Sequence, residues 1–492
     1  MASKNKTKKS APAKATKSQK EDNQSGFLKQ VEVKNQALGY LPNDFPPIGQ
    51  IILLGFQHAL TMFPATVLVA LIVGFHPSVI LLTSGMATIV ALLGSYYGIG
   101  KFIPLYYGSS FSYLAAILAV TNATFGQPVS DELISIAQAG VIVTGLINIL
   151  IGVIIRFAGG KRIVDMVLPP VVTGSVAAVI GFALGKAALD MASGVAGGIP
   201  GGSTQWWSVA VITLFSTILF SVYLRGKGFI GMLPILLGAI VGYVVAAAMG
   251  MVNFDTITQA NLVERVWEKI TFPNFTSEMS ATAIISISIM AIATIPESTA
   301  HLYQIGLYVD HLADEQKRER YGLSEYVGFN LVLDGIGDMI NGMFGGAAGT
   351  NYGENNSLMV ISRNYSGISL LAAAVIAILM AFSGHLAGIV TSIPTAVSGG
   401  LAIYLFGVIG MQGIALMITE KVDMFDPKNL AIGATIMVIG IGGHIGYNSF
   451  LPIPALQGIF PSGWPAIATG AVVGIVLNLI FRIFKTEDMQ TN

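Results

Sequence analysis

The sequence predicts an all-α protein that crosses a membrane many times, as its composition, its apolar segments and the placement of its charges all indicate. Of its 492 residues, 53% are hydrophobic and only 11% are charged, whereas soluble domains carry roughly 25% charged residues. Such a chain has too little polar surface to cover its apolar residues in water. Several apolar stretches reach about 20 residues, the length that a helix needs to cross a bilayer.

The first 45 residues form a separate region. Residues 1–25 are rich in Lys, Ser and Ala and have no apolar periodicity, which is typical of a disordered basic tail. A signal peptide requires an apolar stretch soon after its positive charges, and none begins before about residue 47. We therefore expect residues 1–45 to be a retained, disordered cytoplasmic tail, either solvated or in contact with anionic lipid.

The rest of the chain divides into fourteen hydrophobic segments. The third and the tenth are too short and too polar to cross as ordinary helices. The segments lie near residues 47–74, 77–97, 107–120, 132–158, 164–188, 206–224, 229–251, 280–306, 323–345, 353–364, 367–391, 393–418, 427–443 and 464–485.

Positive charge predicts the orientation, because Lys and Arg are concentrated in cytoplasmic loops. With the N-terminus inside, all of the 26 Lys and Arg residues except Lys186, Arg265 and Lys269 fall on the cytoplasmic side. A wrong number of spans would destroy this separation. We therefore predict fourteen spans in the cell membrane, with both termini in the cytoplasm.

Two pairs of short matches indicate an internal repeat. Residues 168–174 (LPPVVTG), in the fifth segment, match residues 393–399 (IPTAVSG) at the start of the twelfth. Residues 107–111 (YGSSF) in the third match residues 352–356 (YGENN) in the tenth. Because each half holds an odd number of segments, the second half is inverted relative to the first, and a paired interruption in inverted repeats indicates a transporter's binding site.

The interrupted segments would free backbone groups at membrane depth. Gly108 and Gly353 permit the chain to leave helical geometry, and irregular backbone there has to be buried or line a cavity. The freed amide and carbonyl groups can bind a polar solute. We expect the solute to bind at the break around Tyr352, Gly353 and Glu354, with a simple helix kink as the alternative.

Ionisable side chains inside apolar segments are costly and commonly functional. Glu297 and His301 lie four residues apart in the eighth segment, on one face of the expected helix, where an imidazole beside a carboxyl can share a proton. Asp334 and Asp338 have the same spacing in the ninth segment. The alternative for these groups is a structural hydrogen bond in the interior, and it weighs most for Asp338.

Other chemistry is not indicated. Gln57 and His58 in the first segment are candidates for a supporting or helix-packing role. The sequence shows no metal-ligand cluster, no nucleotide-binding loop and no catalytic set, and it contains no cysteine. We expect no enzyme activity, no cofactor and no bound metal.

These motifs resemble those of the nucleobase–ascorbate transporter family, also called nucleobase:cation symporters, and within it the bacterial uracil permeases. The resemblance runs from about Gly55 to Phe484, and it is strongest over residues 57–63 (QHALTMF), 107–111, 297–301 (ESTAH) and 352–355 (YGEN). It implies a homodimer whose protomer has fourteen spans in two inverted seven-span repeats, with short strands in spans 3 and 10.

The resemblance also implies two domains that move against each other. A core domain would hold spans 1–4 and 8–11, at residues 46–158 and 279–391. A gate domain would hold spans 5–7 and 12–14, at residues 159–278 and 392–492, the latter including the C-terminal tail.

The resemblance further implies the solute and the groups that bind it. A nucleobase, expected to be uracil, would meet the carboxyls of Glu297 and Glu354 and the backbones of Phe111 and Gly353, and no nucleic acid would be a partner. Uracil is a flat ring of alternating N–H donors and C=O acceptors, which carboxyl and backbone groups can match. With the candidates from the residues themselves, the full predicted set is Glu297, Glu354, Phe111, Gly353, Tyr352, Ser110 and Asn355 for binding, Glu297, His301 and Asp334 for proton coupling, and Gln57, His58 and Asp338 as supporting groups.

Departures from the family pattern leave the choice of base open. After Glu354, Ser357 and Ser362 stand where the family signature has Gly and Thr. Glu354 itself resembles uracil permeases, whereas Asp334, in the sequence Asp-Gly-Ile-Gly, resembles purine carriers. Xanthine or urate is therefore the alternative solute. An anion exchanger of the same architecture is a further alternative. Such a protein would be expected to place a basic residue where spans 3 and 10 meet, and residues 350–357 contain none.

Overall fold

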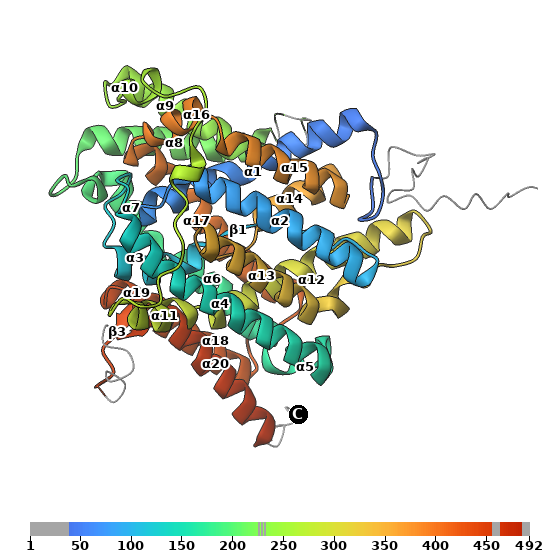
Figure 1. The fold of residues 1–492 in the computed structure, drawn as a ribbon. Helices are drawn as coiled ribbons and strands as arrows, with labels where there is room; N and C mark the ends of the chain where they lie inside the picture. The colour runs from blue at the N-terminus through green and yellow to red at the C-terminus, as the bar shows by residue number, and fades with distance from the viewer. Residues whose placement is uncertain (1–38, 225–226, 228–229, 231–232, 455–462, 485–492) are drawn as a thin grey trace, which may run out of the picture.

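The structure is a computed structural model that describes residues 39–224, 227, 230, 233–454 and 463–484, so the predicted tail up to residue 38 lies outside the described residues. Most of the described chain is helical (Figure 1). The helices are α1 (Ile48–Val73), α2 (Pro77–Ile99), α3 (Leu114–Thr121), α4 (Asp131–Ala158), α5 (Lys161–Val167), α6 (Pro170–Ala183), α7 (Gly185–Ser193), α8 (Thr204–Tyr223), α9 (Pro234–Ala248), α10 (Asp255–Thr258), α11 (Ser280–Ser288), α12 (Ala291–Glu315), α13 (Val327–Phe344), α14 (Gly353–Ser362), α15 (Gly367–Ala381), α16 (Gly384–Thr391), α17 (Thr395–Thr419), α18 (Pro427–Met437), α19 (Gly443–Gly446) and α20 (Ala466–Ile483). The strands are β1 (Tyr107–Ser109), β2 (Gly349–Asn351), β3 (Phe450–Leu451) and β4 (Trp464–Pro465).

Long apolar helices dominate the fold. Among the described residues, nine helical stretches are long and apolar enough to cross a membrane, and α6 with α7 and α11 with α12 each form one of them. Large apolar side chains such as Phe157, Leu379 and Ile418 are exposed on the outside, where lipid can cover them. The chain is therefore a multi-pass membrane protein.

Where the structure describes them, the fourteen predicted segments overlap these elements, but several of them are not single helices. The fifth runs from the end of α5 through α6 into α7, the eighth covers α11 and much of α12, and the eleventh covers α15 and α16. In the eleventh, the Ser383 hydroxyl accepts a hydrogen bond from the Leu386 amide (3.3 Å) and so caps a new helix. Hydrophobic length alone does not reveal such breaks.

The helices pack into two groups. In the first, α2 packs against α13 and α15, and α4 packs against α11 and α13; α2, α13 and α4 lie side by side in Figure 1. In the second, α17 packs against α6, α7 and α8, and α18 packs against α6 and α20. Glycines permit the closest approaches: a Cβ on Gly335 of α13 would lie 2.4 Å from the Gly145 carbonyl oxygen of α4, and one on Gly181 of α6 would lie 2.2 Å from the Gly410 nitrogen of α17.

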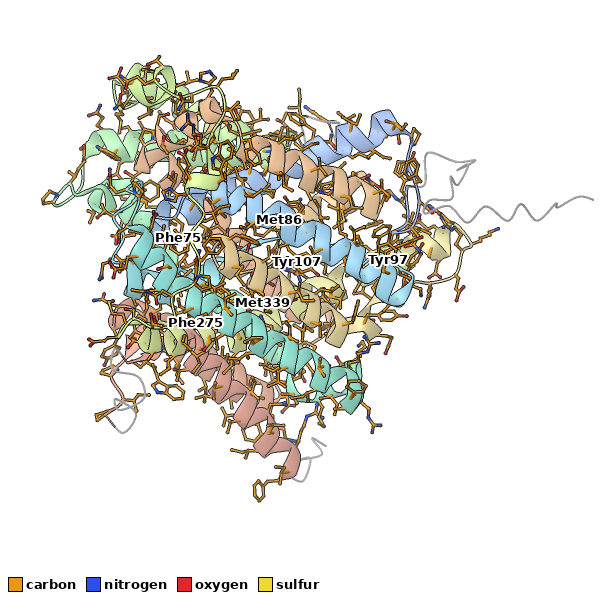
Figure 2. The ribbon with its side chains drawn as sticks, viewed as in Figure 1. Phe75, Met86, Tyr97, Tyr107, Phe275 and Met339 are labelled. Atoms are coloured by element: carbon orange, nitrogen blue, oxygen red, sulfur yellow. The ribbon has the colours of Figure 1, made fainter. Side chains whose placement is uncertain are left out.

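Strands β1 and β2 pair antiparallel in the interior, where Tyr107 of β1 lies among the helices (Figure 2). Gly108 is opposite Thr350 and Gly349 is opposite Ser109. Backbone bonds from the Tyr352 amide to the Tyr106 carbonyl (2.8 Å) and from the Ser110 amide to the Ala348 carbonyl (3.0 Å) extend the pairing. A Cβ on Gly349 would lie 2.1 Å from the Gly108 carbonyl oxygen, so only glycine allows this approach.

The position of the break in the tenth segment differs from the sequence-based prediction. The extended chain is residues 349–352, and helix α14 already begins at Gly353. Neither Gly108 nor Gly353 has a positive φ, so these glycines are not required for an unusual backbone conformation. They are required because a side chain would collide with its neighbours, as described below.

The end of the predicted disordered tail is also different. Tyr40 and Leu41 are buried, and the Tyr40 carbonyl accepts a hydrogen bond from the Tyr365 amide (2.9 Å). Asp44 accepts two hydrogen bonds from the Arg318 guanidinium, both 2.7 Å long. The described residues up to 45 are thus packed against the loops that follow α12 and α14, which local composition could not predict.

Candidate functional site

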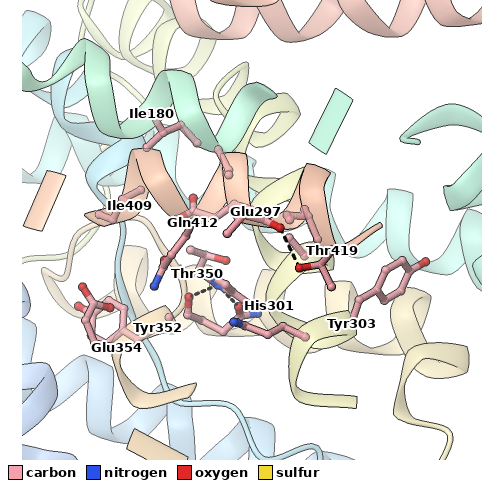
Figure 3. A pocket seen from close by; sticks show the side chains of 18 of the residues that line it. Ile180, Glu297, His301, Tyr303, Thr350, Tyr352, Glu354, Ile409, Gln412 and Thr419 are labelled. Atoms are coloured by element: carbon pink, nitrogen blue, oxygen red, sulfur yellow. Dashed lines mark hydrogen bonds between the residues drawn. The ribbon is translucent and has the colours of Figure 1, made fainter. Parts of the chain in front are cut away.

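A cavity of about 450 Å³ lies between α12, α17 and the antiparallel pair of strands β1 and β2, which we call the β1–β2 crossing (Figure 3). This volume is within the range of about 300–1,000 Å³ that is usual for small-molecule sites. Its inner end is lined by the ends of the strands, and its outer end by His311 of α12 and by Glu420, which follows α17. His311 and Glu420 are both exposed, so the cavity opens to water at the C-terminal ends of these two helices.

Glu297 lies in the wall that α12 provides. Its Oε2 accepts hydrogen bonds from the Ser112 hydroxyl (2.9 Å) and from the Ser110 hydroxyl (3.3 Å). Both serines follow β1, so the carboxyl is held beside the end of that strand. None of the ion pairs among the described residues includes Glu297.

His301 lies one helical turn further along α12. Its Nδ1 lies 2.9 Å from the Asn351 carbonyl oxygen and 2.8 Å from the Asn351 Oδ1. Because both neighbours are acceptors, the assigned tautomer carries the proton on Nδ1 and leaves Nε2 free to accept a hydrogen bond. Glu297 and His301 both line the cavity, as their spacing predicts, but each is hydrogen-bonded to a different partner and not to the other.

Glu354 lies in the first turn of α14, where the helix dipole favours a negative charge. It is half-buried and lines the cavity, as does Gly353 before it. A Cβ on Gly353 would lie 2.9 Å from His301 Nε2 and 3.3 Å from the Gln412 Oε1. Two polar side-chain atoms therefore already lie against Gly353, and a side chain at this position would displace them.

Two aromatic residues close the inner end of the cavity. The Tyr352 hydroxyl is hydrogen-bonded to the Thr66 hydroxyl (2.9 Å) and to the Ser109 hydroxyl (3.1 Å), which fixes its ring. A Cβ on Gly108 would lie 2.6 Å from this ring, so glycine is required there too. Phe111 meets Phe406 of α17 edge to face, with ring centroids 4.9 Å apart.

Ser110 also lines the cavity, whereas Asp334 and Asp338 of α13 do not. Asp334 accepts a hydrogen bond from the Thr350 hydroxyl (3.1 Å). Asp338 accepts bonds from the Gly349 amide (2.7 Å) and from the Asn148 side chain (3.0 Å). Both aspartates therefore hold β2 against α13.

The predicted site residues of the first segment do not line the cavity either. The Asn355 side-chain amide donates to the His58 carbonyl oxygen (3.1 Å) and lies 3.2 Å from the His58 Nδ1. Gln57 and His58 are both buried in α1. Asn355 and His58 thus join α14 to α1, and none of these three residues lines the cavity.

Sequence reasoning did not single out Gln412, Asn351 or Ser112. Gln412 is a lone amide in an apolar segment, a signal that could have been used, whereas the other two depend on contacts between distant parts of the chain. Among the residues that the structure describes, no group of three or more His, Cys, Asp or Glu side chains could hold a metal ion.

A cavity at a pair of broken helices, buried in a multi-pass membrane protein, is the arrangement of a secondary transporter. Residues 49–448 match the sequence profile of the family described as the permease family, and the chain belongs to that family.

The relatives of this chain cover it almost end to end. It is 36% identical over 438 residues to the uracil permease of Bacillus caldolyticus, covering 89% of this chain and 93% of that one. It is 34% identical over 447 residues to the uracil permease of Escherichia coli (strain K12), with 89% and 93% covered. With the uracil permease of Bacillus subtilis (strain 168) it shares 32% over 454 residues, with 91% and 96% covered.

Solved structures show a similar fold. The transmembrane domain of the cyanobacterium bicarbonate transporter BicA aligns with a TM-score of 0.53 at 14% identity, over 92% of this chain and 99% of that one. The overall structure of SLC26A9 aligns with a TM-score of 0.59 at 12% identity, over 90% and 66%. At such low identity the likeness concerns the fold alone.

Proposed function

We propose that the protein is a proton-coupled symporter that imports a nucleobase, uracil first of all, through the cavity at the β1–β2 crossing. The observation that carries this proposal is the lining of the cavity. Among the described residues it includes the carboxyls of Glu297 and Glu354 and the chain ends of both strands, but no Lys or Arg. Such a wall suits a neutral ring with hydrogen-bonding edges better than an anion.

The chemistry of uracil fits these groups. Its N–H groups can donate to a carboxylate, and its carbonyl oxygens can accept from a protonated carboxyl, a hydroxyl or a backbone amide. Protonation of Glu297 or Glu354 would change which atoms of the base can bind, and this links solute affinity to the proton. His301 is adjacent and has a free Nε2, so it is the proposed third member of the proton path.

The proposed architecture follows the two packing groups. The first group would form the core domain and the second the gate domain of a fourteen-span inverted repeat that works as a homodimer. The cavity lies between α12 and α17, of which α12 would belong to the core domain and α17 to the gate domain. Lys317, Arg318 and Lys421 follow these helices, so the positive-inside rule makes the open end of the cavity cytoplasmic.

A purine such as xanthine or urate is the second candidate. The observation that favours it is Asp334, whose sequence context resembles that of purine carriers. Its carboxyl accepts a hydrogen bond from the hydroxyl of Thr350 in β2. Uracil remains the first candidate because Glu354 lies in the cavity itself, and because the curated relatives are uracil permeases.

Uptake of labelled uracil tests the site. Glu354→Gln should reduce uptake about tenfold to a hundredfold, because a charge-assisted hydrogen bond contributes roughly 1.5–3 kcal/mol. The matched control is Glu420→Gln, a glutamate at the open end of the same cavity, which should retain most of the uptake. Near-normal transport by the Glu354 variant would contradict the proposed site.

The same assay decides between bases and tests coupling. Xanthine, urate, thymine and adenine are added as competitors, and the strongest one identifies the class of base.

An uncoupler, which collapses the proton gradient, should reduce uptake by the wild-type protein. Uptake that is unchanged by the uncoupler would contradict proton coupling.

A further inference from the structure

Gln412 has no assigned role, yet it occupies the wall of the cavity opposite the strands. It lies on α17, in a stretch where its neighbours along the cavity are Ile409, Gly413 and Leu416. Figure 3 shows its side chain extending from α17 towards the side of His301. Its amide makes none of the hydrogen bonds found among the described residues.

The free amide and a free ring nitrogen both lie close to Gly353 in the cavity wall. The Gln412 Oε1 and the His301 Nε2 lie 3.3 Å and 2.9 Å from the point that a Cβ of Gly353 would occupy. His301 is held in place through its Nδ1, which contacts Asn351. A flat polar ring bound in the cavity beside Gly353 would therefore lie within reach of the Gln412 amide.

The chemistry of an amide side chain differs from that of the two carboxyls in the cavity. An ionised carboxylate only accepts hydrogen bonds, whereas a carboxamide offers an acceptor oxygen and donor N–H groups side by side. This pair matches an edge of a nucleobase on which an N–H lies next to a C=O. Two hydrogen bonds can then form in one plane.

We infer that Gln412 is a specificity-determining residue, which pairs its carboxamide with an N–H/C=O edge of the bound base. This inference rests on the proposed function and deepens it, because it assigns the edge of the base that faces α17. Gln412 lies on α17, in the proposed gate domain, whereas Gly353, Glu354 and Glu297 lie on α14 and α12, in the proposed core domain. A base that binds all of them would bridge the two proposed domains.

Equilibrium binding to the purified protein tests the inference. Gln412→Leu keeps the approximate size of the side chain and removes both hydrogen bonds. The dissociation constant of uracil should rise about tenfold to a hundredfold. The matched control is Met411→Leu, a neighbour on α17 that is 56% exposed and does not line the cavity; it should bind uracil as the wild type does.

A second readout separates recognition from a structural effect. Binding of N1-methyluracil and N3-methyluracil is measured to each variant, because each methyl group blocks one N–H. If Gln412 pairs with an N–H/C=O edge, the wild-type protein should discriminate against one of these derivatives. In Gln412→Leu this discrimination should shrink by about tenfold, whereas a structural effect would weaken uracil and both derivatives equally.

The outcomes are distinct. Unchanged uracil binding by Gln412→Leu, or an equal loss for uracil and both derivatives, would overturn the inference while leaving the proposed function intact. Wild-type protein that binds no nucleobase would overturn both.

Discussion

At the scale of single residues, the buried aspartates of α13 show that a carboxyl group inside the membrane can have a structural role, as a hydrogen-bond acceptor for a nearby strand. Asp338 is 1% exposed and bonds the Gly349 amide at the start of β2 and the Asn148 side chain of α4. Both of these neighbours are donors, and a carboxylate can satisfy both. Among the ionisable groups of the apolar segments, Asp338 is the one for which the sequence most favours a structural role, and these two hydrogen bonds support that role.

Asp338→Ala should destabilise the protein by about 1–3 kcal/mol, because the Gly349 amide would be left buried without an acceptor. The measurement is thermal unfolding of the purified protein in detergent, with uracil binding as a second readout. Asp338→Asn is the matched control, since its amide oxygen can still accept from Gly349 and the Asn148 amide can rotate to accept from its NH₂ group. Equal unfolding temperatures for the alanine variant and the wild type would contradict this role.

At the scale of secondary-structure elements, the strand crossing is the feature that the sequence predicted in part. The match of residues 107–111 with residues 352–356 correctly indicated that the third and tenth segments depart from ordinary helices. It misplaced the second strand by a few residues, because Gly349–Asn351 carries no periodic pattern of its own. Its extended form depends on pairing with β1, more than 200 residues earlier in the chain.

Gly349→Ala should disrupt the crossing and with it the site. Its Cβ would lie 2.1 Å from the Gly108 carbonyl oxygen, a backbone atom that can move only if the strands separate. Uracil binding should fall at least about tenfold, as expected when groups at a site are displaced by about an ångström. The control is Gly407→Ala in α17, where an added Cβ meets nothing within 4 Å and alanine favours the helix by about 1 kcal/mol. Normal binding by the Gly349 variant would show that the strands tolerate separation.

At the scale of the whole molecule, the assembly of the site from helices far apart in the chain is what sequence reasoning could not supply. Glu297, His301 and Glu354 could be found because each is an ionisable group in an apolar segment. That Gln412 faces Gly353 could not, because it depends on how α17 lies against α12 and the strands. A pattern along one segment predicts which face is polar but not which distant segment that face meets.

The same assembly predicts from which side of the membrane the cavity can be reached. The chain contains no cysteine, so a single introduced thiol reports on one position. Thr419→Cys, at the open end of the cavity, should react with a membrane-impermeant maleimide only in inside-out vesicles. Gln127→Cys, exposed in the loop between α3 and α4, should react only in right-side-out vesicles, because this loop follows the third of the predicted spans. Uracil should slow the reaction at Thr419→Cys if the two packing groups close on the base, and it should leave Gln127→Cys unchanged. Reaction of both positions from the same side would contradict the proposed orientation, since an odd number of the proposed membrane spans separates them.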